Sequence, residues 1–234
     1  GMIANNASGT RTVLYGSTRD YVMRLVVALA SGELIELGTR ASKSSSGYSL
    51  INLFVGSEGT LGIVVAATLR LVGFPAEVSA AVATFPSVEA AARAVYELKR
   101  SGLNPAALEL LGPECINLMN HEEQLGLDVA PTLFIEFHGA TTEQLAEGLA
   151  AAKEICTGQG CTDFRPGLGR AERDRIFKAR HALGEMIQRN HPEHHILIMD
   201  VAVPITRYIE LLTEMQAEVK AHGLIAYTLS HAGN

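Results

Sequence analysis

The sequence lacks tryptophan, cysteines spaced for disulfides, and any hydrophobic run long enough to cross a membrane. Its cysteines, Cys115, Cys156 and Cys161, are odd in number and include no CxxC pair, so neither a disulfide framework nor a cysteine metal site is expected. The longest apolar runs are far shorter than the ~20 residues of a membrane span and suit buried strands. Nothing before Gly1 resembles a signal peptide. We therefore expect a reduced, cytoplasmic protein without a transmembrane segment.

The chain also has no excess of positive charge. It contains 19 Lys and Arg against 25 Asp and Glu, which gives a net charge of −6 at pH 7. A charge of that sign argues against a non-specific nucleic-acid binder. Hydrophobic residues make up 47% of the 234 residues, as is typical of a globular chain with one or two domains.

Residues 1–72 are rich in strand and turn patterns. They predict a hairpin with a turn at Ser31-Gly32, a short helix and a further strand, at residues 21–39, 50–54 and 62–74. The pattern changes at Gly73-Phe74-Pro75. We therefore place a domain boundary there, which divides the chain into residues 1–74 and 75–234.

Strands alternate with helices after this boundary. Strands are predicted at residues 79–85, 106–112, 133–139 and 161–166, with helices at 87–100, 114–120 and 142–157. Ser87 is the expected N-cap of the first helix. This order predicts an α+β fold with a split βαβ, ferredoxin-like sheet and helices on one face. Helices at 171–189 and 205–223, which ends at Gly223, and strands at 196–204 and 224–231 are expected to follow.

Two polar loops rich in glycine stand out in the first segment. They read GMIANNASGT at residues 1–10 and GSEGTLGIV at residues 56–64. Such backbone can approach a polar ligand closely, although loops of this composition are more often simple turns. Two of them in one short segment favour a binding site.

Several motifs in a fixed order carry a resemblance to a known family. They are GMIANNASGT, KSSSGY, FVGSEGTLGIV, FKAR, DVAVP and the terminal HAG. With them the chain resembles the FAD-linked oxidases of the vanillyl-alcohol oxidase/p-cresol methylhydroxylase (PCMH) superfamily, in particular glycolate oxidase, D-lactate and D-2-hydroxyglutarate dehydrogenases. The resemblance implies the second part of a PCMH-type FAD-binding domain at residues 1–74, followed by a ferredoxin-like cap domain for the substrate at residues 75–234.

The resemblance also implies which residues hold FAD in the intact enzyme. The first loop supplies Asn6, Ala7, Ser8 and Gly9, followed by Tyr15 and Gly16, and the second supplies Ser57, Glu58, Gly59, Gly62 and Ile63. Backbone N–H groups in such loops suit diphosphate oxygens. The alternative is that these glycines only form tight turns and that Ser57 and Glu58 cap a helix.

Arg180 is the residue that the resemblance places against the carboxylate of the substrate. It lies in RDRIFKARHAL, where Ile176, Ala179 and Leu183 form an apolar stripe at helical spacing. A guanidinium and a carboxylate can pair through two parallel hydrogen bonds, which explains the need for arginine. The alternative is a solvated basic face of the helix.

His231 belongs to the terminal SHAGN, residues 230–234. In metal-dependent relatives the matching histidine is the first ligand of a divalent metal close to the substrate hydroxyl. The further ligands are not in this chain, and one histidine is too few for a zinc-like site. We therefore expect His231 to be a catalytic residue that forms at most part of a metal site. The alternative is a histidine at a strand end that is bonded to backbone.

The expected activity is that of a flavin-dependent oxidoreductase which oxidises a small 2-hydroxy acid of the glycolate or D-lactate type by hydride transfer to FAD. Because the first part of the flavin domain is missing, we expect the chain to be inactive alone and to bind FAD weakly or not at all. It is then a domain, a truncated frame or a split subunit, with a homodimer, the other half of the FAD domain or an electron-transfer subunit as partner. The alternative is a non-catalytic α+β module that self-associates.

Overall fold

The computed structural model describes residues 1–167 and 170–233, so Asn234 of the terminal motif lies outside the described residues. The chain divides into two compact units, Gly1–Phe74 and Pro75–Asn234. The division lies where the sequence pattern changes from strands and turns to alternating helices and strands. That the first unit is part of an FAD-binding domain stays a prediction.

The first unit contains a three-stranded antiparallel sheet in the order β2-β1-β3. Its elements are α1 (Thr12–Tyr15), the 3-10 helix η1 (Thr18–Tyr21), β1 (Val22–Ala28), β2 (Leu34–Gly38), α2 (Ile51–Phe54) and β3 (Ile63–Leu69). Leu25 and Val27 of β1 are fully buried and pack with Phe54 and Val55. Ile63, Val65 and Leu69 of strand β3 are exposed.

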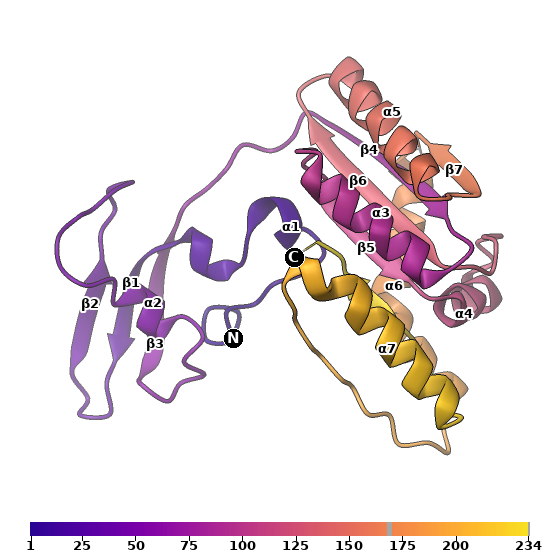
Figure 1. The fold of residues 1–234 in the computed structure, drawn as a ribbon. Coiled ribbons are helices and arrows are strands. Elements are labelled where there is room, and N and C mark those ends of the chain that lie inside the picture. Colours follow the sequence, from indigo (N-terminus) through magenta and orange to yellow (C-terminus); the bar gives the residue numbers. More distant parts are fainter. Residues whose placement is uncertain (168–169, 234) are drawn as a thin grey trace. The chain divides into compact units, whose positions relative to one another are not determined.

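The second unit contains a five-stranded antiparallel sheet in the order β7-β4-β6-β5-β8, of which Figure 1 labels the first four strands. Its elements are β4 (Glu77–Thr84), α3 (Val88–Arg100), β5 (Ala107–Leu111), α4 (Pro113–Glu123), β6 (Thr132–Gly139), α5 (Thr142–Gly158), β7 (Asp163–Pro166), α6 (Arg170–Asn190), η2 (Ile205–Arg207), α7 (Tyr208–Ala221) and β8 (Leu229–His231). Strands β4 to β7 have the ferredoxin-like order, with α4 inserted and β8 added beside β5. The predicted fold class is confirmed.

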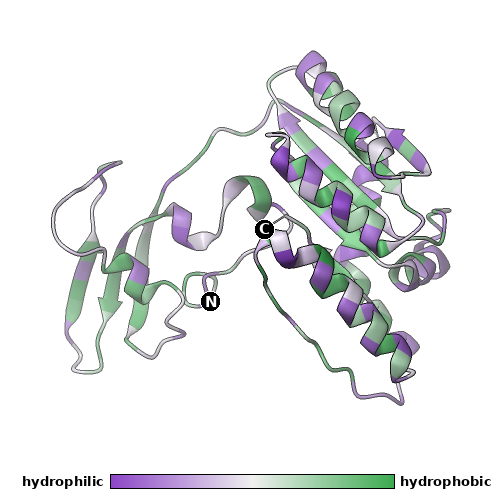
Figure 2. Cartoon of the chain, viewed as in Figure 1, coloured by the Kyte–Doolittle hydropathy of each residue, from purple (hydrophilic) through white to green (hydrophobic). Residues whose placement is uncertain are grey.

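Helices cover both faces of this sheet, so the prediction that they lie on one face is wrong. Side chains such as Ala81 and Ile135 join the core beneath α3, α5 and α7, whereas Val82 and Phe134 join the core beneath α4 and α6. The reason is visible in the central strands, because a run such as LFIEFHG is apolar at successive positions and not only at alternate ones. The hydropathy colouring shows the corresponding green stripes on strands and helices (Figure 2).

Two predicted local signals are confirmed. The Ser87 side chain accepts a hydrogen bond from the Ala90 N–H and caps α3. At the end of α7, Gly223 has a φ of +60° and the Leu224 N–H donates to the Val219 carbonyl, so the chain turns out of the helix there.

The strand predicted at residues 196–204 is absent, and the last strand is shorter than predicted. Residues 196–204 form no ladder with any strand the structure describes, and only Leu229–His231 of residues 224–231 pairs, as β8 with β5. Leu197, Ile198 and Met199 are largely exposed. An apolar run becomes a strand only where a neighbouring strand takes its backbone hydrogen bonds. In the described part of the chain, none of the helices is both long and apolar enough to cross a membrane.

Candidate functional site

Helix α6 brings two arginines to one face of the second sheet. Ile176, Ala179 and Leu183 are buried along one stripe of the helix, as the sequence predicted. Arg173 and Arg180 are seven residues apart, close to two helical turns, so both lie on the same side. The packing of the stripe therefore directs both guanidinium groups to the sheet.

Strands β5 and β8 supply the groups that meet Arg180. The antiparallel register places Glu109 of β5 directly opposite His231 of β8. Glu109 also lies opposite Phe134, whose side chain packs in the core under α6, so the three residues share this face. The register alone thus brings a carboxylate and an imidazole together beneath α6.

Arg180 and His231, predicted separately, converge on Glu109. The Arg180 Nε–H donates to Glu109 Oε2 over 2.6 Å, and His231 Nδ1 lies 2.7 Å from Glu109 Oε1. Arg180 Nη2 is 3.4 Å from His231 Nδ1. Glu109 is 1% exposed, whereas the side chains of Arg180 and His231 are 12% and 36% exposed. The three groups form a polar cluster that is buried at the carboxylate and open at the imidazole.

Glu109 was not predicted from the sequence as a site residue. A signal was present, because AALELLG is an otherwise apolar strand with one carboxylate in its middle. A buried carboxylate is costly unless cations or hydrogen-bond donors meet it, so a single acid in such a strand indicates a paired or functional group. The identity of its partners depended on strand register and on the position of α6, which the local sequence does not contain.

Tyr208 supports β8 from the opposite face of the sheet. Its hydroxyl forms a hydrogen bond with Ser230 Oγ, next to His231 in the chain. Burial is the main cause that raises the pKa of Tyr208, to about 12, so the phenol stays neutral near pH 7. This contact helps to hold the strand that carries His231.

A second polar cluster lies on the same face of the sheet. Glu136 of β6 is fully buried, its Oε1 lies 2.7 Å from His138 Nε2, and its Oε2 lies 3.5 Å from Arg173 Nη1. It repeats the chemistry of Arg180, Glu109 and His231, but His138 is only 9% exposed. The Glu136 cluster is therefore enclosed where the Glu109 cluster is open.

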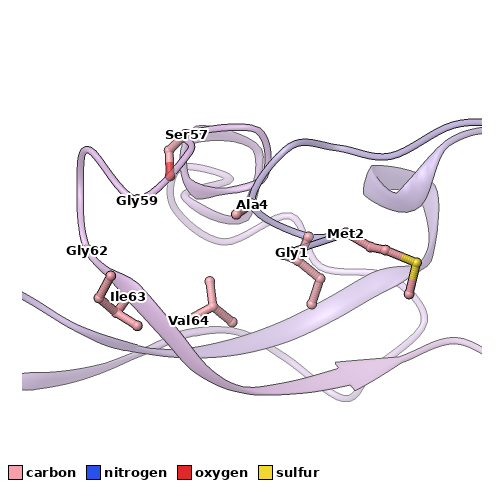
Figure 3. Close-up of a pocket in the computed structure, with 9 residues that line it drawn as sticks. Gly1, Met2, Ala4, Ser57, Gly59, Gly62, Ile63 and Val64 are labelled. Atoms are coloured by element: carbon pink, nitrogen blue, oxygen red, sulfur yellow. The ribbon is translucent and has the colours of Figure 1, made fainter. Parts of the chain in front are cut away.

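The first unit contains an open pocket of about 370 Å³ where the two glycine-rich loops meet β3 (Figure 3). The Glu58 N–H donates to the Ala4 carbonyl over 2.8 Å, and the Gly56 N–H donates to the Ile3 carbonyl over 3.1 Å. These bonds join two loops that are about fifty residues apart in the sequence. The pocket is lined by Gly1, Met2, Ile3, Ala4, Ser57, Gly59, Gly62, Ile63 and Val64.

The predicted flavin residues divide between this pocket and the loop before β1. Ser57, Gly59, Gly62 and Ile63 line the pocket, with Glu58 beside them in the chain. The other predicted residues lie outside its lining, and they are Asn6, Ala7, Ser8, Gly9, Tyr15 and Gly16.

Contacts within the loop before β1 explain two of these residues structurally. Asn6 Oδ1 accepts a hydrogen bond from the Arg19 N–H. Gly16 has a φ of +80°, and a Cβ there would collide with Asp20, which bonds Ser17 in a capping box. The turn interpretation is therefore sufficient for Gly16, while a role in flavin binding stays a prediction for the whole set.

The described residues do not by themselves form a metal site. Across residues 1–167 and 170–233, no three His, Cys, Asp or Glu side chains are grouped so that they could hold a metal ion. His231 has the carboxylate of Glu109 beside it, but that group is already bonded to Arg180. One imidazole and one engaged carboxylate do not fit the three or four ligands of a zinc-type centre.

Comparison with known proteins places the chain among flavin-linked enzymes. Residues 74–234 match the family model "FAD linked oxidases, C-terminal domain". The whole chain aligns with 48% of a probable mitochondrial D-lactate dehydrogenase of Danio rerio, at 38% identity. It also aligns with 50% of the glycolate oxidase subunit GlcD of Bacillus subtilis, at 30% identity. A D-2-hydroxyglutarate dehydrogenase of Xanthomonas citri pv. viticola aligns with 93% of this chain at 34% identity, and the alignment covers 46% of that enzyme. The chain thus spans about half the length of these relatives.

Two solved structures share the fold. An alkyldihydroxyacetonephosphate synthase matches 93% of this chain and 44% of its own, with a TM-score of 0.67 and 21% identity. A p-cresol methylhydroxylase matches 66% of this chain and 36% of its own, with a TM-score of 0.51 and 16% identity. At these identities the likeness supports the PCMH-type architecture alone.

Proposed function

Because the chain belongs to the family of FAD linked oxidases, whose C-terminal domain model its residues 74–234 match, we propose that it is part of a flavin-dependent oxidoreductase which oxidises a small 2-hydroxy acid to the 2-oxo acid. The D-lactate, glycolate and D-2-hydroxyglutarate enzymes among its relatives support this substrate class. The observation that carries the proposal is the convergence of Arg180, Glu109 and His231 at one partly open cluster.

Arg180 is proposed to bind the carboxylate of the hydroxy acid. Glu109 accepts a hydrogen bond from its Nε–H, and its Nη2 lies next to the His231 ring. Two parallel N–H groups at that end suit a carboxylate and fix its orientation. A ligand carboxylate bound there lies beside His231, because Arg180 Nη2 is 3.4 Å from the imidazole.

His231 is proposed to take the hydroxyl proton of the substrate. Removal of the O–H proton to an imidazole nitrogen and loss of the C2 hydrogen as hydride leave a carbonyl, so atoms and electrons balance when a hydride acceptor is present. FAD, when bound, supplies the acceptor of that hydride. No step is assigned to a metal, because the described residues do not fit one.

We propose residues 1–74 as the second part of an FAD-binding domain and residues 75–234 as the cap domain that binds the substrate. The pocket of the first unit supports this division, since its glycines leave backbone open to a ligand and its volume of about 370 Å³ lies in the usual range for small-molecule sites. Ser57, Gly59, Gly62 and Ile63 would hold part of the dinucleotide. Several relatives are named mitochondrial enzymes, and a cytoplasmic location stays a prediction.

Ligand-induced stabilisation of the purified chain tests the substrate class. D-lactate and glycolate should raise its melting temperature, whereas lactamide, which lacks the carboxylate, should not. The gain should be lost in Arg180→Met and kept in Arg189→Met, a change at an exposed arginine of the same helix. Equal protection by lactamide, or full protection of Arg180→Met, would overturn the proposal.

The cofactor and the alternative function need separate measurements. We expect the isolated chain to bind FAD weakly or not at all, so stoichiometric flavin absorbance in the purified chain would contradict that expectation. An obligate dimer formed through residues 1–72, together with no effect of any hydroxy acid, would favour the non-catalytic module. Strand β3 gives that alternative some support, because its apolar side chains Ile63, Val65 and Leu69 are exposed.

A further inference from the structure

The contacts of His231 Nδ1 cannot all be hydrogen bonds at once. A carboxylate without its proton only accepts, so the contact with Glu109 Oε1 at 2.7 Å requires Nδ1 to carry a proton. A guanidinium only donates, so the contact with Arg180 Nη2 at 3.4 Å requires Nδ1 to be unprotonated. The shorter contact has the distance of a charge-assisted hydrogen bond, and the longer one lies beyond the usual range.

From this conflict we infer that Glu109 is a positioning residue which holds His231 in the tautomer protonated at Nδ1 and fixes Arg180 through its Nε edge. Two groups are thereby left for a ligand. His231 Nε2 presents its lone pair. Arg180 Nη2 lies next to a ring nitrogen that carries a proton and cannot accept from it, and among residues 1–167 and 170–233 it has no other hydrogen-bond acceptor. The inference deepens the proposed function and rests on it, because it explains how one carboxylate prepares both the proton acceptor and the anion-binding group.

The position of Glu109 suits this task because the backbone holds it from two directions. It lies inside β5, between β6 and β8, and it is opposite Phe134 on one side and His231 on the other. A side chain in the middle of a sheet has few alternative rotamers and is shielded from water, so its hydrogen bonds are directional and strong. A surface carboxylate could not impose one imidazole tautomer in the same way.

The Glu136 cluster provides a matched comparison within the same unit. Glu136 is equally buried, lies on the same face and meets an arginine of the same helix, but its imidazole partner is His138 and not His231. A variant at Glu136 therefore removes similar burial and charge from a neighbouring carboxylate whose imidazole partner is not His231. If Glu109 acted only through the stability of the fold, a Glu136 variant of similar stability would change the His231 tautomer to a similar extent.

The test reads the His231 tautomer directly. Nitrogen-15 NMR of the chain, with its 8 histidines labelled and the His231 signal assigned from a His231→Gln variant, distinguishes protonated Nδ1 from protonated Nε2. The neutral wild-type ring should favour protonated Nδ1 by at least ~tenfold, as a hydrogen bond to a charged group implies. Glu109→Gln should lower that preference severalfold, because an amide can both donate and accept.

Glu109→Leu removes the acceptor altogether, and it is the second variant in case glutamine keeps the hydrogen bond to His231. Glu136→Gln is the control and should leave the His231 signals unchanged. A wild-type ring protonated at Nε2, a preference unchanged in both Glu109 variants, or an equal change in Glu136→Gln would overturn the inference. Binding of D-lactate is measured on the same samples. If His231 is protonated at Nδ1 only when Glu109 is present, but the chain binds no hydroxy acid, the positioning role is supported and the proposed function is refuted.

Discussion

Arg180→Met should destabilise the second unit, because it leaves the carboxylate of Glu109 without its cation. Glu109 is 1% exposed, so breaking a fully buried pair of this kind costs about 3–5 kcal/mol. The expected loss is somewhat smaller, about 2–4 kcal/mol, because Arg180 is 12% exposed and His231 still holds the other carboxylate oxygen. Methionine fills most of the space of the arginine stem, so the change tests charge more than packing.

Urea unfolding followed by circular dichroism measures this loss, which corresponds to roughly 4–16 °C in melting temperature for a chain of this size. Arg189→Met is the control, because its ion pair with Glu122 lies on the surface and its removal should not change stability measurably. Combining Arg180→Met with Glu109→Gln should cost less than the sum of the two single changes, by about 1–2 kcal/mol. A stability of Arg180→Met within about 0.5 kcal/mol of wild type, or strict additivity in the double variant, would refute the buried ion pair as a source of stability.

Further changes test the local structure. Ser87→Ala should cost about 1 kcal/mol in urea unfolding, because it removes the N-cap acceptor of α3, and an unchanged midpoint would contradict that role. Gly38→Ala should weaken the β1–β2 hairpin, because Gly38 has a φ of +83° and a Cβ would collide with the Met23 carbonyl, and hydrogen exchange of the hairpin amides would show faster opening. Burial raises the pKa of Cys115 and of Tyr208 to about 12, from 9.0 and 10.0, so both groups ionise more readily in the unfolded chain. The stability that they contribute is present below about pH 9 and is lost as the pH rises towards 12, and a flat urea midpoint over that range would speak against their burial.

Local signals in the sequence were enough to predict most of the fold. Ser87 before an amphipathic run and Gly223 after one marked the helix ends, because capping and left-handed backbone depend on the residue itself. The same holds for the alternation that predicted β1 and β2. The run at residues 196–204 failed as a prediction because its pattern specifies burial only, whereas a strand also needs a neighbour to pair with.

Two members of the Glu109 cluster were named from the sequence, and the third depended on register. Arg180 and His231 were proposed from their motifs, 51 residues apart in the chain, and their roles stay predictions. Glu109 precedes Arg180 by 71 residues in the chain. The pairing of β5 with β8 and the packing of α6 bring it between Arg180 and His231. Contacts of that range are products of the whole fold, so neither residue spacing nor helical periodicity contains them.

The energetics of the sheet face under α6 favour a functional reason for the Glu109 cluster. Buried ion pairs seldom stabilise a fold more than well-packed apolar side chains of similar volume, and Val82, Phe134 and Leu111 already show that this face can be covered by apolar packing. The chain nevertheless places charged groups there twice. At Glu136 the imidazole partner is enclosed, and at Glu109 it reaches solvent, with His231 36% exposed. The two clusters have the same chemistry and differ in the exposure of the imidazole. In the inferred arrangement, the exposed Glu109 cluster offers a ligand both an oriented imidazole and the N–H groups of Arg180.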